Sequence, residues 1–571
     1  KKVDKGRHEV RLKSDFATLL AEGEFNFTNI ANSITNAIYH RLPTIPGLVQ
    51  KKGVDNKINV YATINKSDWA EKLLGVNLRL NEPVHLVANI DDSNHNVNIS
   101  LDAEDFNYNG SNYKNGFLFI TCPNDTMRAT ANAMTHSNKS SATYTLRAQA
   151  VDNHLTTNLV FHSDSKHVLK GEMNLDARFH ENENGQSTAD INILPSSVYV
   201  NDTVWTLDPA HIVYYKNHLD IDGLAIHNDD QSISINGKAS ESRDDELKVE
   251  LKDMNVSYIL DLIDFHSVEF AGYATGEVHG RSLFGKPEAE AELKVSDFHF
   301  EGGRMGVLHT KANWNIDEGA INIDAMTTDE GNTTKILGYV SPKNDNIDLK
   351  IHADGSRLEF LKNYTEAFMD NIKVHGWGDV NVIGPLSAIQ IVGSAKVDGE
   401  VRVKPLNTTY TLKDATVALK PNDISFVNDT IRDIKGNIGI VNGHMRHQNL
   451  SNFTFDIDID TDNLLAYDTH EFGDDTFYGT AYVTGKCSMK GVSGKIVIDV
   501  DATPNQGSMI VYNTSSPDAI SSNEFITWSD RDAKKNSPLD TADTKTAEQS
   551  KVREISSDLY LNRFLHCTPS T

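Results

Sequence analysis

The residues with the clearest chemical potential are four aspartates spaced two apart, Asp456, Asp458, Asp460 and Asp462. On a β-strand, residues two apart lie on one face about 6.6–7 Å from each other, so these carboxylates would form a row. Such a row could hold calcium, which takes several oxygen ligands. Because apolar residues alternate with the aspartates and the glycine-rich nonapeptide of calcium-binding β-rolls is absent, we favour the solvated side of an amphipathic strand.

Other catalytic or metal-binding patterns are missing. His444 and His447 form the closest histidine pair, but a spacing of three on a strand or turn points them in different directions. Cys122, Cys487 and Cys567 are widely separated and lack the CxxC or Cys/His spacing of a zinc site. The GxxxxGK(S/T), GxGxxG, HExxH and GxSxG signatures are also absent. We therefore expect no enzyme, no metal and no cofactor.

The charge balance limits the possible partners. Asp and Glu number 80 against 54 Lys and Arg, which gives a net charge of −26. Nucleic-acid phosphates require a basic face, and anionic lipid headgroups attract basic segments. We therefore expect neither nucleic-acid binding nor tight adsorption to an anionic membrane surface.

The elements that would position these side chains are β-strands, because apolar and polar residues alternate with a period of two throughout the chain. The residues between the apolar ones are mostly Asp, Asn, Lys, Glu, Ser and Thr, so each strand has one apolar and one wet face, as in antiparallel sheets. We predict an all-β fold, an elongated antiparallel sheet of on the order of 40 strands with a few short helices. Clear examples of the alternation are Val97/Ile99/Leu101/Ala103 and Met173/Leu175/Ala177/Phe179.

Helical spacing is confined to three short stretches. Ile30, Ile34, Ile38 and Leu42 follow an i, i+4 pattern, and similar patches occupy residues 256–263 and 358–372. We predict single short helices that cap or plug the sheet.

A weak internal repeat begins near Gly272, Gly376 and Gly479. The starts are 376 − 272 = 104 and 479 − 376 = 103 residues apart. Glycine within a strand marks a bend or a close backbone approach, so each copy is a place where the sheet would curl.

The long apolar face must either enclose a packed core or line an open trough, and both arrangements show the same alternation. In a trough, each buried CH₂ of an acyl chain would contribute about 0.8 kcal/mol. The candidate lining residues are Ala289, Ala291, Leu293, Val295, Ile347, Leu349, Ile351, Ile389, Ile391, Phe453, Phe455, Ile457, Ile459, Ile496, Ile498 and Val500.

Several glycine-rich and aromatic segments, none of them catalytic, stand in a characteristic order along nearly the whole chain. They are 205–209 (WTLDP), 272–280 with Pro287, 376–385, 406–410, Gly443-His444 with Asn449-Leu450, and 477–482 followed by Gly485. Together they resemble the TamB family, the AsmA-like subunit of the translocation and assembly module, in its Bacteroidota form.

The resemblance implies a taco-like β-groove of repeating units that crosses the periplasm, anchored in the inner membrane by an N-terminal helix absent from this sequence. It implies phospholipid or other acyl-chain cargo moving toward the outer membrane. It also implies a partnership with an outer-membrane barrel of the TamA or BamA type.

The expected domains follow from these patterns. Residues 1–200 form an N-terminal groove segment with the short helix near 30–42, and 201–520 form the repeating groove. Residues 521–558 are polar, charged and aperiodic, so we predict a disordered loop. Residues 559–571 are the expected start of the C-terminal region with which the family meets its barrel.

Three functions remain open. The first is a lipid-conducting groove. The second is a scaffold or chaperone for unfolded outer-membrane strands, which would use exposed sheet edges for β-augmentation. The third is a secreted β-helical adhesin or polysaccharide lyase, although a lyase would need clustered carboxylates with Lys or Arg in a cleft.

Overall fold

The computed structural model describes residues 2–512 and 560–562, apart from short gaps at 5–6, 27, 68–76, 137–140, 165–167, 201–202, 263–267, 367, 449–450, 473–476 and 493–494. The chain divides into two compact units. The first contains residues 1–265, 273–295 and 311–317, and the second contains 266–272, 296–310 and 318–571. The predicted disordered loop 521–558 lies outside the described residues.

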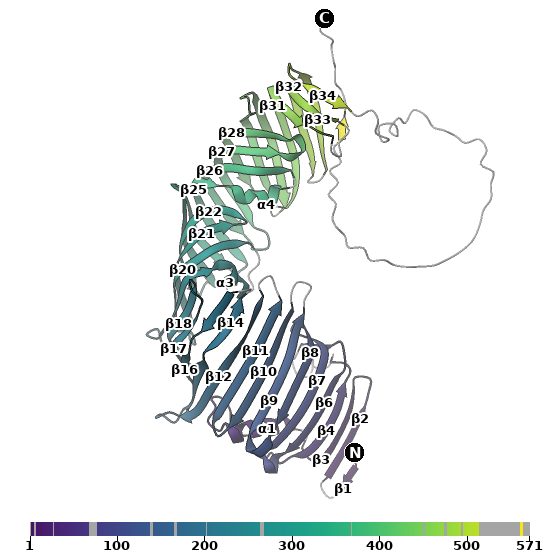
Figure 1. Ribbon diagram of the computed structural model, residues 1–571, viewed down its shortest axis with the longest axis vertical. Coiled ribbons are helices and arrows are strands. Elements are labelled where there is room, and N and C mark those ends of the chain that lie inside the picture. Colours follow the sequence, from purple (N-terminus) through teal and green to yellow (C-terminus); the bar gives the residue numbers. More distant parts are fainter. Residues whose placement is uncertain are drawn as a thin grey trace, which may run out of the picture. The chain divides into compact units, whose positions relative to one another are not determined.

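The strands have the following bounds, and most appear in Figure 1. The first unit holds β1 (Lys2–Asp4), β2 (Arg7–Lys13), β3 (Ala17–Glu24), β4 (Lys57–Ile64), β5 (Leu78–Leu80), β6 (Val84–Asp91), β7 (Asn96–Tyr108), β8 (Ser111–Thr121), β9 (Met127–His136), β10 (Ser141–Val151), β11 (His154–Asp164), β12 (Leu169–Glu181), β13 (Ser187–Leu194), β14 (Ser196–Val200), β15 (Thr203–Leu207), β16 (Ala210–Tyr215), β17 (His218–His227), β18 (Ser232–Ala239) and β19 (Glu246–Asn255). Strands β20 (Phe270–Arg281), β21 (Glu288–Phe300) and β22 (Gly303–Asn315) contribute residues to both units. The second unit continues with β23 (Ala320–Asp329), β24 (Asn332–Ser341), β25 (Asn346–Arg357), β26 (Met369–Gly384), β27 (Gln390–Val403), β28 (Thr408–Lys420), β29 (Asp423–Arg432), β30 (Ile438–Gln448), β31 (Ser451–Thr469), β32 (Phe477–Val492), β33 (Lys495–Pro504), β34 (Met509–Tyr512) and β35 (Tyr560–Asn562).

Helices are few and short. They are α1 (Ile30–Arg41), α3 (Val256–Leu262) and α4 (Lys362–Thr365), with 3₁₀ turns η1 (Asp92–Asn94), η2 (Pro123–Asp125), η3 (Glu359–Leu361) and η4 (Lys404–Leu406). The first two match the predicted stretches, although Ile263 lies outside the described residues. The third stretch was predicted too long, because Ile372 lies in β26, which pairs with β27 from Met369 onward.

The strands pair antiparallel with their neighbours in the chain over most of each unit. In the first unit, β12 pairs with both β13 and β14, so the sheet forks there before β17 rejoins it. In the second unit β23 to β33 follow one another, and the short β35 adds a parallel pair with β33. The prediction of an all-β, antiparallel fold with a few short helices is confirmed.

Tight hairpins set the register of these strands. Between β7 and β8, Asn109 and Gly110 have φ angles of 49° and 88°. Positive φ at both central residues is the type I′ turn, whose twist matches that of the flanking strands. Asp152 and Asn153, at φ 50° and 57°, join β10 to β11 in the same way.

The sheet bends at a recurring β-bulge in which one residue has a positive φ and its N–H donates to a side-chain oxygen on a neighbouring strand. The geometry is clear at Asn428, whose N–H lies 2.8 Å from Asn442 Oδ1, and at Asn463, whose N–H lies 2.9 Å from Thr484 Oγ1. Each coincides with a register shift between the paired strands. The other copies are Gly223 with Asn236, Asp253 with Thr275, and Asp414 with Asp398. Such bulges increase local twist and curl the sheet.

The glycines of the internal repeat allow close contact between strands. Gly378 has a φ of 148°, and a Cβ built there would lie 2.3 Å from the carbonyl oxygen of Ser394. Gly276 and Gly479 are similar, with φ angles of 151° and 147° and Cβ positions 2.1 Å and 2.0 Å from a neighbouring carbonyl. The repeat therefore marks backbone positions that only glycine fits.

The turn from β29 to β30 is tied to β31 by one carboxylate. Asp433 is 4% exposed and accepts hydrogen bonds from the backbone N–H of Lys435, Asn437 and Leu465, at 2.8 to 2.9 Å, and from the Asn437 side chain at 2.8 Å. Burial, the largest single influence, favours a raised pKa for Asp433. The side-chain and backbone hydrogen bonds together outweigh it and lower the pKa.

We expect the substitution Gly378→Ala to destabilise the second unit by about 3 kcal/mol or more, because both a strained φ and a backbone collision result. Gly436→Ala is the matched control. Gly436 also has a positive φ, of 87°, but a Cβ there meets open space, so only the strain cost of about 1–3 kcal/mol applies. Calorimetric unfolding measures the stability of both variants. An equal loss of stability in the two would show that the backbone collision at position 378 adds no cost.

We expect Asp433→Asn to lower the free energy of unfolding by about 1–3 kcal/mol at pH 7, where the native carboxylate is ionised. The folded-state pKa lies below the unfolded value of about 3.9, so this stabilisation is complete above that value and is lost as the pH falls through the folded pKa. Urea unfolding at neutral and acidic pH tests this: the difference between wild type and variant should shrink on acidification, and a difference independent of pH would contradict it.

Candidate functional site

The first unit carries a continuous row of apolar side chains on one face of its sheet. Strand pairing places ten residues opposite one another from β2 to β12. They are Leu12, Leu19, Ala62, Leu86, Leu101, Leu118, Ala131, Leu146, Leu159 and Met173. All ten are half-buried or exposed, with Leu12 at 38% and Leu146 at 41%. We call this side the inner face, and the charged side the outer face.

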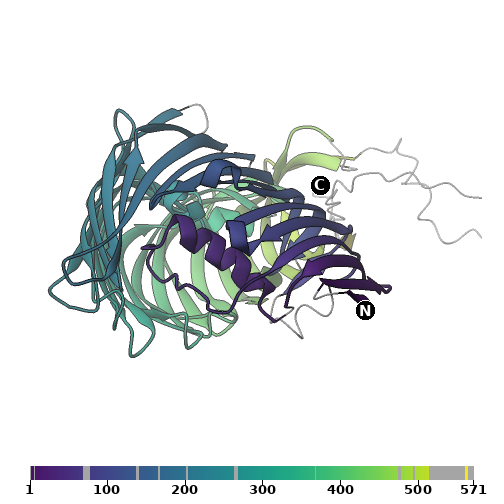
Figure 2. The same cartoon turned by 90° about the horizontal axis from the view of Figure 1, so that it is seen from below.

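Helix α1 covers part of the inner face. Its residues Ile30, Ile34, Ala37 and Ile38 pack against a buried cluster on β3 to β13. The cluster includes Ala21, Ile58, Ala88, Ile90, Val97, Ile99, Ala177, Phe179 and Ala189. Figure 2 shows the helix, in dark purple, running across the strands. The prediction that this short helix plugs the sheet agrees with these contacts.

Buried polar groups hold α1 in place at its middle. Ser33, 0% exposed, donates a hydrogen bond from Oγ to Asp92 at 2.9 Å. Asn56, 1% exposed, donates from Nδ2 to Ser33 Oγ at 2.9 Å and from its backbone N–H to Asp92 at 2.6 Å. Beyond the helix, Thr44 donates from its backbone N–H to Asn153 Oδ1 at 3.1 Å.

Arg41 fixes the C-terminal end of α1. Its side chain is 2% exposed, and its guanidinium donates to the backbone carbonyls of Ala37, His95 and Asp125 at 3.0, 2.7 and 3.1 Å. It also donates to the Asp125 carboxylate at 3.1 Å. His95 stacks on His40, and burial together with the nearby positive charges lowers its pKa. The helix is therefore bound to η1 and η2 through polar contacts.

In the second unit, register brings the predicted lining residues onto shared rows. One row from β25 to β33 contains Ile351, Val380, Gly393, Leu419, Ile424, Met445, Phe455, Gly491 and Ile496. A neighbouring row contains Ile457, Met489 and Ile498. A third row contains Leu349, Val382 and Ile391. A fourth row contains Ile459, Cys487 and Val500. The side chains of Ile496 and Ile498 lie outside the described part.

The remaining predicted lining residues differ in exposure. Ala289, Ala291, Leu293 and Val295 alternate along β21, where Val295 is 5% exposed and the others are half-buried. Ile347, 8% exposed, lies opposite Gly384, and Ile389 precedes β27. Phe453 and Phe455 are 6% and 2% exposed, so these two rings are covered by other parts of the chain.

The cover over Phe453 and Phe455 is the connection between β25 and β26, residues 358–368, which we call the strap (Figure 1, α4). Phe368 meets Phe455 edge to face at 4.7 Å between ring centroids. Tyr364 packs on the same cluster, and burial followed by the Glu301 charge raises its pKa. The sequence pattern places Phe368 within the predicted helical stretch 358–372, but it does not show which residues the Phe368 ring covers.

The second unit also curls through a contact between strands that are not neighbours. The buried hydroxyl of Tyr410, on β28, donates to the carbonyl of Leu465, on β31, at 2.9 Å. Burial raises the pKa of Tyr410 to about 12. An apolar cluster accompanies this contact and contains Tyr410, Ile431 and Leu464, from β28, β29 and β31.

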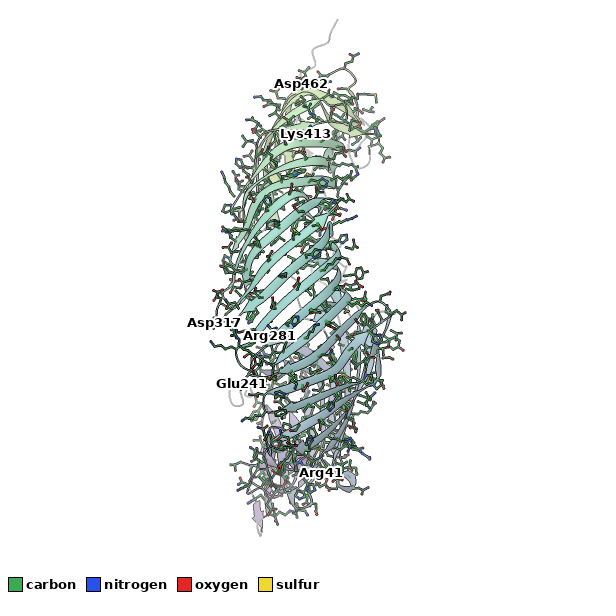
Figure 3. The ribbon with its side chains drawn as sticks, turned by 90° about the vertical axis from the view of Figure 1, so that its left-hand side faces the viewer. Arg41, Glu241, Arg281, Asp317, Lys413 and Asp462 are labelled. Carbon is green, nitrogen blue, oxygen red and sulfur yellow. The ribbon has the colours of Figure 1, made fainter. Side chains whose placement is uncertain are left out.

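The outer face is polar and carries complementary charges across strands. On β19 and β20, Glu246 pairs with His279 at 2.9 Å and with Arg281, and Lys248 pairs with Glu277 at 2.8 Å. The hydrogen bond with His279 is the largest influence lowering the pKa of Glu246. Figure 3 shows charged side chains such as Lys413 and Asp462 projecting from the second unit.

The aspartate row of β31 belongs to this outer face. Asp456 lies opposite Lys490, with 3.3 Å between its carboxylate and the ammonium, and Asp460 lies opposite Lys486. The lysines neutralise charge that would otherwise attract a cation. Among the described residues, no group of three or more His, Cys, Asp or Glu side chains is arranged to hold a metal ion.

The two histidines singled out in the sequence point to different surroundings. His444 lies 3.0 Å from the Asp423 carboxylate, whereas the ring of His447 packs on Phe453 at 5.8 Å and burial lowers its pKa. Cys487 is half-buried, and burial raises its pKa to about 11, which disfavours the reactive thiolate form.

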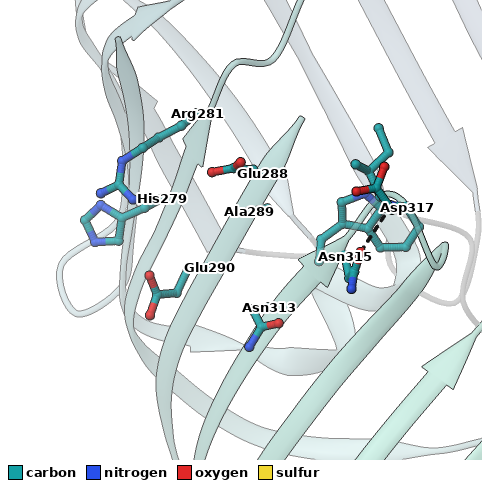
Figure 4. Close-up of a pocket in the computed structure, with 10 residues that line it drawn as sticks. His279, Arg281, Glu288, Ala289, Glu290, Asn313, Asn315 and Asp317 are labelled. Carbon is teal, nitrogen blue, oxygen red and sulfur yellow. Dashed lines mark hydrogen bonds between the residues drawn. The ribbon is translucent and has the colours of Figure 1, made fainter. Parts of the chain in front are cut away.

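A polar pocket of about 350 Å³ lies at the ends of β20 to β22 in the first unit. His279 and Arg281 reach it from β20, Glu288 and Glu290 from β21, and Asp317 from the turn beyond β22 (Figure 4). The lining is charged, and Arg281 and Asp317 pair with the neighbouring Glu246 and Lys286, so the pocket offers little to an apolar ligand.

Sequence reasoning missed two buried polar groups. Arg41 looked like an ordinary cation at a helix end, which favours that position through the helix dipole. Asp329, 8% exposed, pairs with Arg357 and Arg304, but sequence placed it only on the alternating strand β23. Apart from Ala37, which lies four residues before Arg41, their partners lie 25 to 84 residues away, and no local pattern marks such distances.

No helix within the described ranges is both long enough and apolar enough to cross a membrane.

Comparison with known proteins gives one match. Residues 428–563 match the family model described as the TamB C-terminal domain. No curated protein and no solved structure shows a significant match. The resemblance to the TamB family is thereby confirmed over this segment, which includes β30 to β34. The match concerns this segment of the chain and does not distinguish lipid transport from autotransporter assembly.

We expect Arg41→Ala to destabilise the first unit by about 3–5 kcal/mol, because it removes a buried side chain and its hydrogen bonds to one buried and two part-buried carbonyls. Asp125→Ala is the matched control. Its carboxylate is 62% exposed and its backbone carbonyl is retained, so we expect a loss of about 1 kcal/mol or less. Thermal unfolding with an apolar dye reports both, and equal losses would show that the exposed ion pair, not the carbonyls, fixes α1.

Proposed function

We propose that this TamB-family chain carries phospholipid in the periplasm, with the acyl chains on the inner face of its sheet. The cargo would pass between the inner and outer membranes and support outer-membrane biogenesis. Periplasmic location and anchoring in the inner membrane are part of the proposal, since the family is associated with the cell envelope. TamB proteins are non-enzymatic components of transport and assembly, and we propose the same for this chain.

The observation that carries the proposal is the ten-residue apolar row of the first unit. It crosses β2 to β12 without a charged residue, and every member keeps part of its surface in water. With about 4.8 Å between strands, the nine spacings between its ten strands cover about 43 Å. An exposed apolar strip of this size marks a binding surface, because ordinary protein surfaces carry smaller patches.

The chemistry of the two faces favours a chain-like amphipathic ligand. Aliphatic side chains on the inner face suit acyl chains, whose burial contributes about 0.8 kcal/mol for each CH₂. The outer face carries charged side chains that already form ion pairs with one another across the strands. A lipid could therefore lie along the inner face with its headgroup in water, and no specific headgroup contact is required.

Assembly of outer-membrane proteins is a second candidate, supported by β34, which lies at an edge of the sheet among the described residues. It pairs with β32, and its residues Met509 and Ile510 are 61% and 52% exposed. An exposed apolar edge is a template for β-augmentation by another chain. We propose a TamA- or BamA-type barrel, or its substrate strands, as the partner of this edge.

The lipid proposal is tested by loading and transfer. We expect phospholipid to be extracted from the purified chain, and labelled phospholipid to move between vesicles in its presence. Leu146→Arg places a charge on the inner face and should reduce transfer several-fold. The matched control is Phe119→Arg, because Phe119 is 51% exposed but lies on the outer face of β8, opposite Ser100 and Thr130.

The outcomes separate the two candidates. Absence of bound phospholipid, or equal transfer by a folded Leu146→Arg variant, would refute the lipid groove. Crosslinking of β34 to a nascent barrel protein, with no lipid bound, would establish the assembly function in its place.

A further inference from the structure

The strap is a longer connection between two paired strands than a tight hairpin needs. Strands β25 and β26 pair antiparallel, as do β23 and β24, yet β23 and β24 are joined by the tight turn Glu330–Gly331. The described residues 358–366 and 368 instead cross the face of the second unit that carries the apolar rows of β25 to β33.

The strap contacts three separate parts of that face. Phe360 packs against Phe300 on β21, with 5.4 Å between the ring centroids and the ring planes tilted by 57°. Leu358 and Leu361 pack on the cluster of Ile372, Val374, Val397 and Ala415. Tyr364 and Phe368 pack on Phe453, Phe455, Met445 and Ile457 of β30 and β31. The strap thus occupies the rows that hold several of the predicted lining residues.

The two ends of the strap are anchored differently. At its start, Arg357 pairs with the buried Asp329, with Glu330 at 2.8 Å and with Glu359 at 3.2 Å. At its far end, Phe368 contributes a carbonyl that accepts the backbone N–H of Lys404 at 3.0 Å, and its ring provides apolar contact. Lys404 Nζ also donates to the carbonyl of Glu366 at 2.6 Å, and Asn363 Nδ2 donates to the carbonyl of Glu301 at 2.7 Å. These two hydrogen bonds are exposed, so water can replace them when the strap lifts, and another apolar group can replace the aromatic contacts.

Helix α1 shows what a fixed cover looks like in the same chain. It is bound through the fully buried Ser33, the nearly buried Asn56 and the buried Arg41. Releasing it would leave these polar groups unpaired in an apolar environment, which is costly. If an acyl chain displaces Tyr364 and Phe368, the apolar contacts of these side chains with Phe453 and Phe455 are replaced by apolar contacts with the acyl chain.

We propose that the strap occupies an acyl-chain site on β30 and β31, and that a lipid chain must displace Tyr364 and Phe368 to bind there. The proposal rests on the lipid-carrying function. It makes the strap a displaceable plug, and it makes α1 a permanent cover.

The test locks the strap in place. Phe368→Cys and Phe455→Cys are combined in a chain whose own cysteines are replaced by alanine. A short bifunctional thiol reagent then joins the two positions, and a monofunctional reagent of the same chemistry serves as the control. We expect the joined protein to transfer labelled phospholipid several-fold more slowly than the control, with joining verified by peptide mass spectrometry.

A second variant keeps the proposal testable if the joined protein is unstable. Phe368→Ala should weaken the plug and raise the amount of phospholipid bound per chain. Ile38→Ala, which removes a comparable side chain from α1, should leave the amount unchanged, because α1 is held by polar groups. Equal lipid binding and transfer in wild type, joined protein and Phe368→Ala would overturn the plug. A wild type that binds no lipid would instead refute the underlying function.

Discussion

The structure depends on register. Because side chains alternate along a strand, a slip of one residue would carry every apolar side chain of that strand from the inner to the outer face. Two-residue turns such as Asn109–Gly110 prevent this, since their left-handed backbone fixes which residues lie opposite. Leu101 therefore meets Leu118, and Leu146 meets Leu159, strand after strand. The ion pairs of the outer face follow from the same register.

Curvature is added to this regular sheet by local devices that do not disturb the alternation. A bulge residue such as Asn428 donates its N–H sideways to Asn442, so the extra residue is satisfied without a ladder partner. Gly378 allows two backbones to approach where any side chain would collide. A sheet bent at such points can bring β28 close enough to β31 for Tyr410 to bond with Leu465. Strand register determines which side chains lie on each face of the sheet. The bulge residues and the glycines determine how the sheet curls.

Much of this was predictable because it is local. Alternation identified the strands, i, i+4 spacing identified α1, and the glycine echo marked backbone positions closed to other residues. The cover over Phe455 was not predictable, because it depends on Phe368, which lies 87 residues earlier. The burial of Arg41 was hidden for the same reason, since its partners His95 and Asp125 come from other elements. The placement of the lining residues on common rows required the register of each strand, which alternation alone leaves open.

A groove that carries apolar cargo has a conflict that a closed core does not have. Its face must be apolar enough to hold an acyl chain, and the same property drives the sheet to close on itself or to aggregate. Covering elements resolve the conflict, and their anchors determine whether they can move. Polar anchors such as Arg41 are lost without replacement when a cover leaves, because no lipid tail offers a carbonyl or a carboxylate. Aromatic anchors such as Phe368 on Phe455 would compete directly with the proposed lipid cargo. The chemistry of the anchor, more than the area it covers, therefore separates a permanent seal from a plug that the cargo itself can open.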